Sequence, residues 1–203
     1  MPNHVEGLIR ILGDEMVLKE MVEFLKDGDY HISADKIIPY PEKFKKMDND
    51  HYERYGDYAY STPEQAERRN EDYKNGTYFK DGYNTGGYEW CCNHWGTKWG
   101  FYNTKVSDII ELPNGEFMVE YAVFTAWSPA FPVIRRLSEM YPDVTIEYWY
   151  EEEGWCYPAG CVTYNGGEET DDEIWGDIND WKAMEIFEPY ADWLKSQEDD
   201  QNI

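Results

Sequence analysis

The segment EWCCNHWGTKWGFY, residues 89–102, gathers side chains that metal binding and nucleophilic catalysis both use. Cys91 and Cys92 carry soft sulfur ligands, and a histidine such as His94 serves as a metal ligand or as a general base. Four roles can be weighed for this segment: a metal centre, a nucleophile with its base, a cleft for a small ligand, and a structural seam.

The spacing of the cysteines argues against a metal centre. Structural zinc sites pair their ligands at C-x₂₋₄-C spacing, whereas Cys91 and Cys92 are adjacent, and Pro158 lies between Cys156 and Cys161. We therefore predict no metal and no cofactor, and interpret the cysteines as buried free thiols.

A nucleophilic site needs a third group that orients the base. Cys92 and His94 share one face if this segment is a strand, but no Asn or Asp that would orient the histidine can be identified. We expect a protein without enzymatic activity. The alternative is a small-ligand protein or enzyme with a cleft around His94, Trp95, Lys98 and Trp99, although GTKWG lacks the spacing of a phosphate-binding loop.

The net charge of the chain limits the classes of molecule that it is expected to bind. The chain has 203 residues, with 42 Asp and Glu against 18 Lys and Arg, and a net charge of −24. Such a surface repels nucleic acid and anionic lipid, and it attracts basic protein surfaces. No apolar run approaches the roughly 20 residues that span a bilayer, and the first residues lack the pattern of a signal peptide. We expect a cytoplasmic protein, with its cysteines reduced.

The elements that must position these residues follow a β-α-β-β-α-β order. Alternation predicts a strand over 4–13, and helical spacing predicts a helix over about 14–26. A hairpin over 105–127 turns at Asn114-Gly115, and a helix capped by Ser128 follows. Two further strands are expected, with these boundaries: 143–153, and an edge strand over 160–169. This order predicts an α+β, ferredoxin-like antiparallel sheet with both helices on one face.

Two segments interrupt or extend this domain, which we place at residues 1–167. Residues 40–103 form a Tyr-rich insertion, entered by an extended connection (35–44), with an exposed helix between Thr62 and Gly76. Residues 168–203 hold thirteen Asp and Glu against two lysines, and apolar residues recur there near helical spacing. We expect an acidic amphipathic helical extension.

Several sequence blocks together resemble the YubB ferredoxin-like domain family, small proteins encoded by phages and plasmids. They are MPNHV, KIIPYPE, WCCNHWGTKW, FTAWSPAFPVIRRLSEMYPDVTIEYWYEEEG and AGCVTYNGGE, in that order. The resemblance covers roughly residues 1–168, and its most specific marks are HWGTKW and the block Thr125–Ala130. It implies the ferredoxin-like fold and no settled enzymatic activity, so it supplies no catalytic residues.

Charge and resemblance together predict a binding protein. We expect an accessory protein of a phage or plasmid that docks on a basic surface of a host nucleic-acid-binding protein. The expected outcome is inhibition of a defence system by nucleic-acid mimicry, of anti-CRISPR or anti-restriction type. A homodimer is also open, but direct binding of nucleic acid or membrane is not expected. The predicted partner-binding residues interleave acids with tryptophans: Glu151, Glu152, Glu153, Glu168, Glu169, Asp171, Asp172, Glu173, Trp175, Asp177, Asp180 and Trp181.

Overall fold

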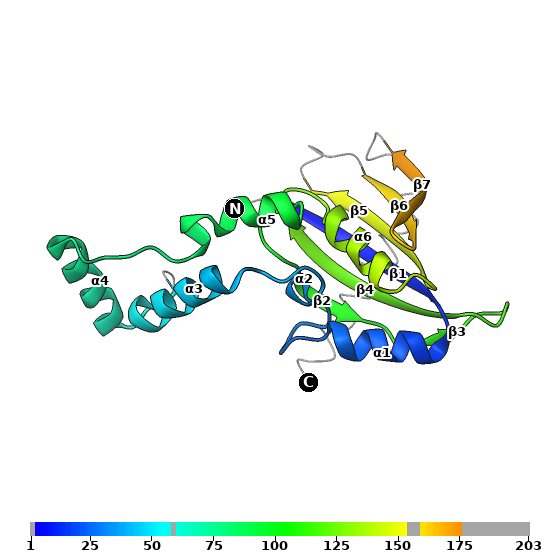
Figure 1. Cartoon of the computed structure of the whole chain (residues 1–203), viewed down its shortest axis with the longest axis horizontal. Coiled ribbons are helices and arrows are strands. Elements are labelled where there is room, and N and C mark those ends of the chain that lie inside the picture. Colours follow the sequence, from blue (N-terminus) through cyan, green and yellow to red (C-terminus); the bar gives the residue numbers. More distant parts are fainter. Residues whose placement is uncertain (1–2, 58–59, 154–158, 176–203) are drawn as a thin grey trace.

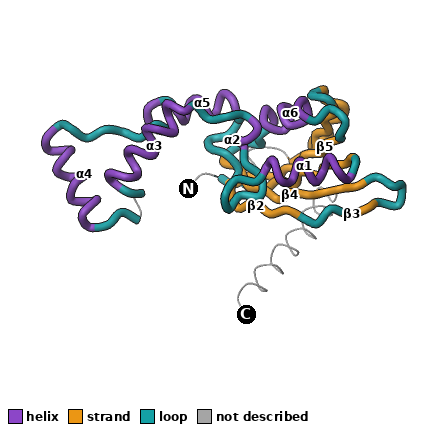
Figure 2. Tube along the Cα trace, turned by 60° about the horizontal axis from the view of Figure 1, so that its bottom comes forward, coloured by secondary structure: helices purple, strands orange, loops and turns teal. Residues whose placement is uncertain are grey.

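A seven-stranded antiparallel sheet forms the centre of the protein, and its helices α1 and α6 pack on one face (Figures 1 and 2). The computed structural model describes residues 3–57, 60–153 and 159–175. In chain order the elements are β1 (His4–Gly13), α1 (Glu15–Leu25), α2 (Ala34–Ile37), α3 (Glu42–Tyr55), α4 (Pro63–Asn75), η1 (Tyr83–Thr85), α5 (Gly87–His94), β2 (Tyr102–Val106), β3 (Ile110–Glu111), β4 (Phe117–Ala126), α6 (Phe131–Met140), β5 (Thr145–Glu152), β6 (Ala159–Asn165) and β7 (Glu168–Trp175).

The sheet order is β2-β4-β1-β5-β6-β7, and β3 also pairs with β4. The inner part, β2-β4-β1-β5 with α1 and α6, is the predicted ferredoxin-like arrangement. The strand β1, the helix α1 and the β3–β4 hairpin with Gly115 in its turn (φ +84°) confirm the sequence predictions. Asp14 caps α1 as expected, because its Oδ1 accepts the Met16 amide at 2.8 Å.

The core lies between the sheet and its two helices. Alternate residues of β1, β4 and β5 point towards α1 and α6, and most of them are fully buried. Leu18, Met21 and Leu25 of α1 fill one side, whereas Met16 in the first turn of the same helix is 76% exposed. Val133, Ile134 and Leu137 of α6 fill the other side and are 0% exposed. No helix in the described ranges has both the length and the apolar character that crossing a membrane requires.

The insertion projects away from the sheet as a helical arm (Figure 1). The predicted exposed helix is α4, where Thr62 and Gln65 form a reciprocal capping box and Gly76 ends the helix with φ +70°. The expectation of an extended connection over 35–44 was wrong in part. Residues 34–37 form the short helix α2, and α3 begins directly after Pro41, which suits the first turn of a helix.

Four further expectations are corrected. Residues 87–94 form α5 instead of a strand, so Cys92 and His94 do not share a strand face. Ser128 does not cap α6, which begins after Ala130; its hydroxyl donates to the Gly96 carbonyl. The strand β6 is not at the edge, because residues 168–175, where we expected the helical extension to begin, pair with it as β7. Residues 176–203 lie outside the described ranges.

Candidate functional site

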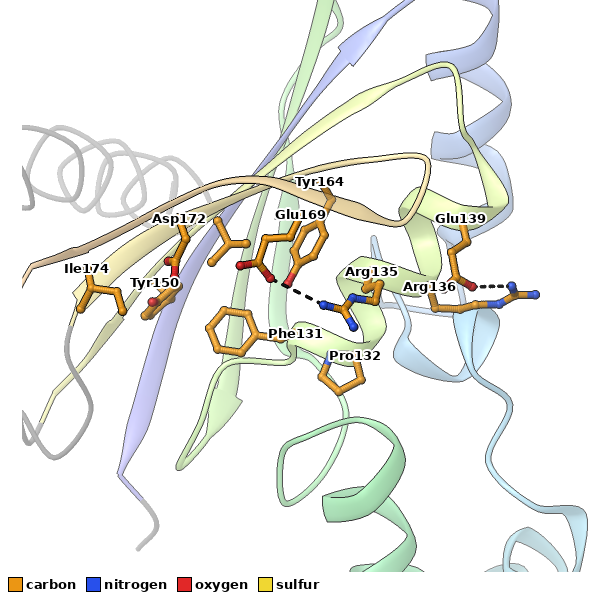
Figure 3. Close-up of a pocket in the computed structure, with 11 residues that line it drawn as sticks. Phe131, Pro132, Arg135, Arg136, Glu139, Tyr150, Tyr164, Glu169, Asp172 and Ile174 are labelled. Atoms are coloured by element: carbon orange, nitrogen blue, oxygen red, sulfur yellow. Dashed lines mark hydrogen bonds and ion pairs between the residues drawn. The ribbon is translucent and has the colours of Figure 1, made fainter.

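A groove of about 450 Å³ runs between α6 and the β6–β7 hairpin (Figure 3). Its walls combine aromatic rings, aliphatic side chains and charged groups of both signs. The lining residues are Phe131, Pro132, Arg135, Arg136, Glu139, Tyr150, Val162, Tyr164, Glu169, Asp172 and Ile174.

The helix α6 supplies one wall because of its amphipathic pattern. Its apolar stripe faces the core, which leaves Pro132, Arg135 and Arg136 on the side towards β7. Arg136 Nη1 donates to Glu139 Oε2 on the same helix at 2.8 Å. Arg135 lies over the Tyr164 ring, 5.8 Å from its centroid. The two arginines are therefore already engaged by neighbours on the groove wall.

The register of three strands supplies the floor and the other wall. Tyr150 is opposite Gly160 on β6, and Gly160 is opposite Ile174 on β7, so these positions share one face of the sheet. Gly160 is required there, because a Cβ would lie 2.5 Å from Tyr150 Oη. The Tyr150 ring meets Phe131 edge to face at 5.0 Å. The absence of a side chain on β6 thus lets an aromatic floor form.

The two carboxylates of β7 in the groove differ in whether they form an ion pair. Arg135 Nη2 lies 3.6 Å from Glu169 Oε2, which is an exposed and therefore weak ion pair. Asp172 has no ion-pair partner among the residues that the structure describes, and its side chain is exposed. Burial, with the neighbouring carboxylate of Glu169, raises the pKa of Tyr164 to about 12, so its hydroxyl stays protonated at neutral pH. Asp172 is the carboxylate that a cationic ligand would meet here.

The structure brings together five of the predicted partner-binding residues, all exposed on β7: Glu168, Glu169, Asp171, Asp172 and Glu173. Glu169 and Asp172 lie on the groove face. Asp171 and Glu173 are opposite Thr163 and Cys161, on the other face of the sheet. The edge strand therefore presents carboxylates on both of its faces.

The other predicted acids separate from this strand. Glu152 is 2% exposed, so it belongs to the interior and not to a docking surface. Glu151 is half-buried, and burial, with the charge of Glu6, raises its pKa. Glu153 is exposed and accepts the His4 amide at 2.9 Å. Trp175 ends β7, and three further predicted residues lie outside the described ranges: Asp177, Asp180 and Trp181.

The four residues of the predicted ligand cleft fall into two groups. His94 stacks on Trp90 with ring centroids 4.4 Å apart, and Trp95 is buried, with Nε1 donating to the Ile38 carbonyl at 2.9 Å. Lys98 instead extends to Trp99 and Trp127, with Nζ 4.9 and 4.4 Å from their ring centroids.

Trp127, which sequence reasoning did not place near Lys98, is 46% exposed and has φ +73°. A bulky residue rarely adopts this left-handed conformation.

Two of the cysteines are buried free thiols as predicted, whereas Cys92 is half-buried. Cys91 and Cys161 are buried, and burial raises the pKa of each thiol to about 12. Across residues 3–57, 60–153 and 159–175, no group of three His, Cys, Asp or Glu side chains is arranged to hold a metal ion. Cys156 lies outside these ranges. The raised pKa values make Cys91 and Cys161 poor nucleophiles, because the thiolate is the reactive form.

Sequence reasoning missed the groove itself. The strand expected over 143–153 contains Tyr150 and the helix expected after Ser128 contains Arg135, but nothing in the sequence indicated that the two would line one groove. The strand β7, which forms one wall of the groove, was not predicted from the sequence. The turn Asn165-Gly166-Gly167, with φ +56° and +83° at its glycines, is typical of a hairpin and could have revealed it.

Comparisons with known proteins place the fold. Residues 98–192 match the family model described as the ferredoxin-like domain in Api92-like protein. The crystal structure of the protein api92 from Yersinia pseudotuberculosis superposes with a TM-score of 0.50 at 10% sequence identity. The match covers 87% of this chain and 99% of that one, and shows a shared fold. Among curated proteins, no sequence matches the chain. The family match extends beyond Gly167, in agreement with the inclusion of β7 in the sheet.

Proposed function

We propose that this Api92-like ferredoxin domain serves to bind a basic protein surface, and that β7 is its contact strand. The observation that carries the proposal is the exposure of five carboxylates within six residues on the last strand of the sheet. A buried or paired acidic cluster would indicate a structural role. Here all five carboxylates are exposed, and Glu169 forms a weak ion pair with Arg135.

The spacing of these charges supports nucleic-acid mimicry. A strand rises about 3.4 Å per residue, so five charges over residues 168–173 average about one per 4 Å. One strand of duplex DNA carries a phosphate about every 3.4 Å of the helix axis. The acids of β7 are divided between the two faces of the strand, so a groove that binds phosphates would meet part of this charge density on each face. The finer proposal, motivated by the YubB-like blocks, is a mobile-element protein that inhibits a nucleic-acid-binding defence factor of its host.

Aromatic groups beside the acids would add affinity to the charge. Exposed ion pairs are each worth only about 0.2–1 kcal/mol and are screened by salt, so they mainly speed association. Phe131 and Ile174 offer apolar surface next to Asp172, on which the aliphatic stem of a lysine or arginine can pack, while Tyr150 is buried beneath them. We therefore expect the charges to raise the rate of association and to orient the partner, and the contacts in the groove to slow its dissociation.

A second candidate, a small-ligand site, is favoured by one observation. Trp127 is exposed in a strained conformation and contacts Lys98, and backbone strain of this kind concentrates at functional sites. Lys98 with Trp99 and Trp127 would suit an anion that carries a ring. This site replaces the cleft that we expected around His94 and Trp95. Lys98→Ala would abolish its function, whereas substitutions on β7 would leave it intact.

The test compares two variants of equal charge. One neutralises the β7 acids (E168Q, E169Q, D171N, D172N, E173Q). The other neutralises five exposed acids elsewhere (E23Q, E53Q, E67Q, E71Q, E111Q). The probe is a fluorescent octapeptide of alternating lysine and arginine, titrated with full-length protein at about 50 and 200 mM salt. We expect the β7 variant to bind at least tenfold more weakly than the control variant. Equal losses in the two variants would show that net charge, not β7, attracts the probe.

A further inference from the structure

Among the residues that the structure describes, the outer edge of β7 has no paired strand. The strand is last in the sheet order, and no described strand pairs with its outer side. An open edge carries backbone N–H and C=O groups in a row, which is a template for pairing with another extended chain. The edge is therefore a second means of recognition, separate from the side chains.

The side chains on this edge select the partner. Asp172 faces the groove, while Asp171 and Glu173 point to the opposite face of the sheet. A second copy of β7 at this edge would bring carboxylates against carboxylates, which is destabilising. A basic strand would instead meet opposite charges. Because both faces are acidic, basic residues beside Glu168, Glu169, Asp171, Asp172 and Glu173 would each find a carboxylate, whichever face they point to.

The groove offers a place for one of these basic side chains. Asp172 lies at a wall formed by Tyr150, Phe131 and Ile174, and Ile174 is 60% exposed (Figure 3). At the other end of the groove Arg135 already approaches Glu169 at 3.6 Å. An incoming cation is therefore directed to the Asp172 end, where its stem packs on the apolar wall.

We propose that the partner contributes an extended segment of consecutive lysines and arginines, which adds as a further strand to the outer edge of β7. One of its side chains enters the groove towards Asp172. This inference rests on the proposed function and specifies its geometry. It excludes a basic helix as the main ligand, since the backbone groups of a helix are bonded within the helix and cannot pair with the β7 edge.

The experiment removes backbone donors from the probe while its charge stays fixed. Two octapeptides of alternating lysine and arginine each carry four N-methyl groups, at alternate residues in one and at four consecutive central residues in the other. Alternate methylation leaves one edge of the extended peptide free to pair, and consecutive methylation blocks both edges. Each is titrated against the full chain.

We expect the alternately methylated peptide to bind within about threefold of the unmodified one, and the consecutively methylated peptide about tenfold more weakly. Equal affinities for all three peptides would overturn strand addition and leave the acidic docking surface standing. Failure of all three to bind at low salt would overturn the proposed function as well.

Variants of the protein test the groove in parallel. Asp172→Lys and Glu67→Lys make the same change in charge, and Glu67 is exposed on α4 in the arm. We expect Asp172→Lys to weaken binding of the unmodified peptide at least tenfold more than Glu67→Lys does. Equal effects would refute the binding of a basic side chain of the peptide at Asp172.

Discussion

A methyl group at position 160 has no room between Tyr150 and β7. A Cβ on Gly160 would lie 2.5 Å from Tyr150 Oη and 2.6 Å from the Glu173 carbonyl oxygen, so the ring or the strand must move. Overpacking of this kind destabilises a protein by about 1–3 kcal/mol. For a chain of 203 residues each kcal/mol lowers the melting temperature by roughly 2–4 °C. We expect Gly160→Ala to lower it by roughly 2–12 °C.

Gly100→Ala is the matched control. The nearest atom to a Cβ there is Ala34 Cβ at 3.4 Å, which is an ordinary contact. Alanine also restricts the unfolded chain, which stabilises by about 0.4–1 kcal/mol at a compatible site. We expect Gly100→Ala to leave the free energy of unfolding unchanged or slightly raised.

A double variant separates the two clashes at position 160. Tyr150→Phe removes the oxygen at 2.5 Å and leaves the contact with the Glu173 carbonyl, so Gly160→Ala combined with Tyr150→Phe should recover only part of the lost stability relative to Tyr150→Phe alone. Urea unfolding followed by tryptophan fluorescence measures each variant. If Gly160→Ala is as stable as the parent, β7 and Tyr150 do not lie as described, and the groove geometry is refuted.

Two further predictions concern titration. Hydrogen bonds from Tyr55 and Arg54 hold the pKa of Asp72 below its usual range, so the network between α3 and α4 is stabilising above about pH 4 and is lost as the pH falls through the lowered folded value. Amide protection factors in α3 and α4, corrected for the slower intrinsic exchange in acid, should fall as the pH falls. Asp72→Asn should remove this acid-dependent step, and protection factors that are equal in both proteins at every pH would contradict the assignment. Because Cys91 and Cys161 have thiol pKa values of about 12, roughly one thiol in ten thousand is ionised at pH 8, and iodoacetamide should modify neither until the protein is unfolded in urea. Peptide mass spectrometry reads out each site, and fast alkylation of either in the native protein would show that its thiol is accessible and ionised.

Local signals were enough for the elements whose sequence and packing agree. The alternation in β1 matches its buried face, and Asp14 and Thr62 cap the helices that follow them. Asn114-Gly115 places the β3–β4 turn, because glycine readily adopts the positive φ that the turn needs. In each case the residues that decide the structure are close together in sequence.

Local sequence signals did not predict the elements whose structure depends on contacts with residues distant in the sequence. The segment of α5 mixes aromatic residues with cysteines and glycine, and its periodicity does not separate a strand from a short helix. Residues 160–169 were predicted as an edge strand because no further strand was expected after them. The residues of β7 are mostly Asp and Glu, which are poor strand formers, so nothing within residues 168–173 predicts a strand.

The sequence by itself determined the charge of the surface, the ferredoxin-like order and the presence of acids after Gly167. Only the tertiary structure decided that these acids form an edge strand, since hydrogen bonds to β6 outweigh their weak local preference. It also decided the groove, whose walls come from residues up to 43 positions apart, Phe131 to Ile174. Such a site exists only when helix packing and strand register are both satisfied, and neither is encoded in a single segment.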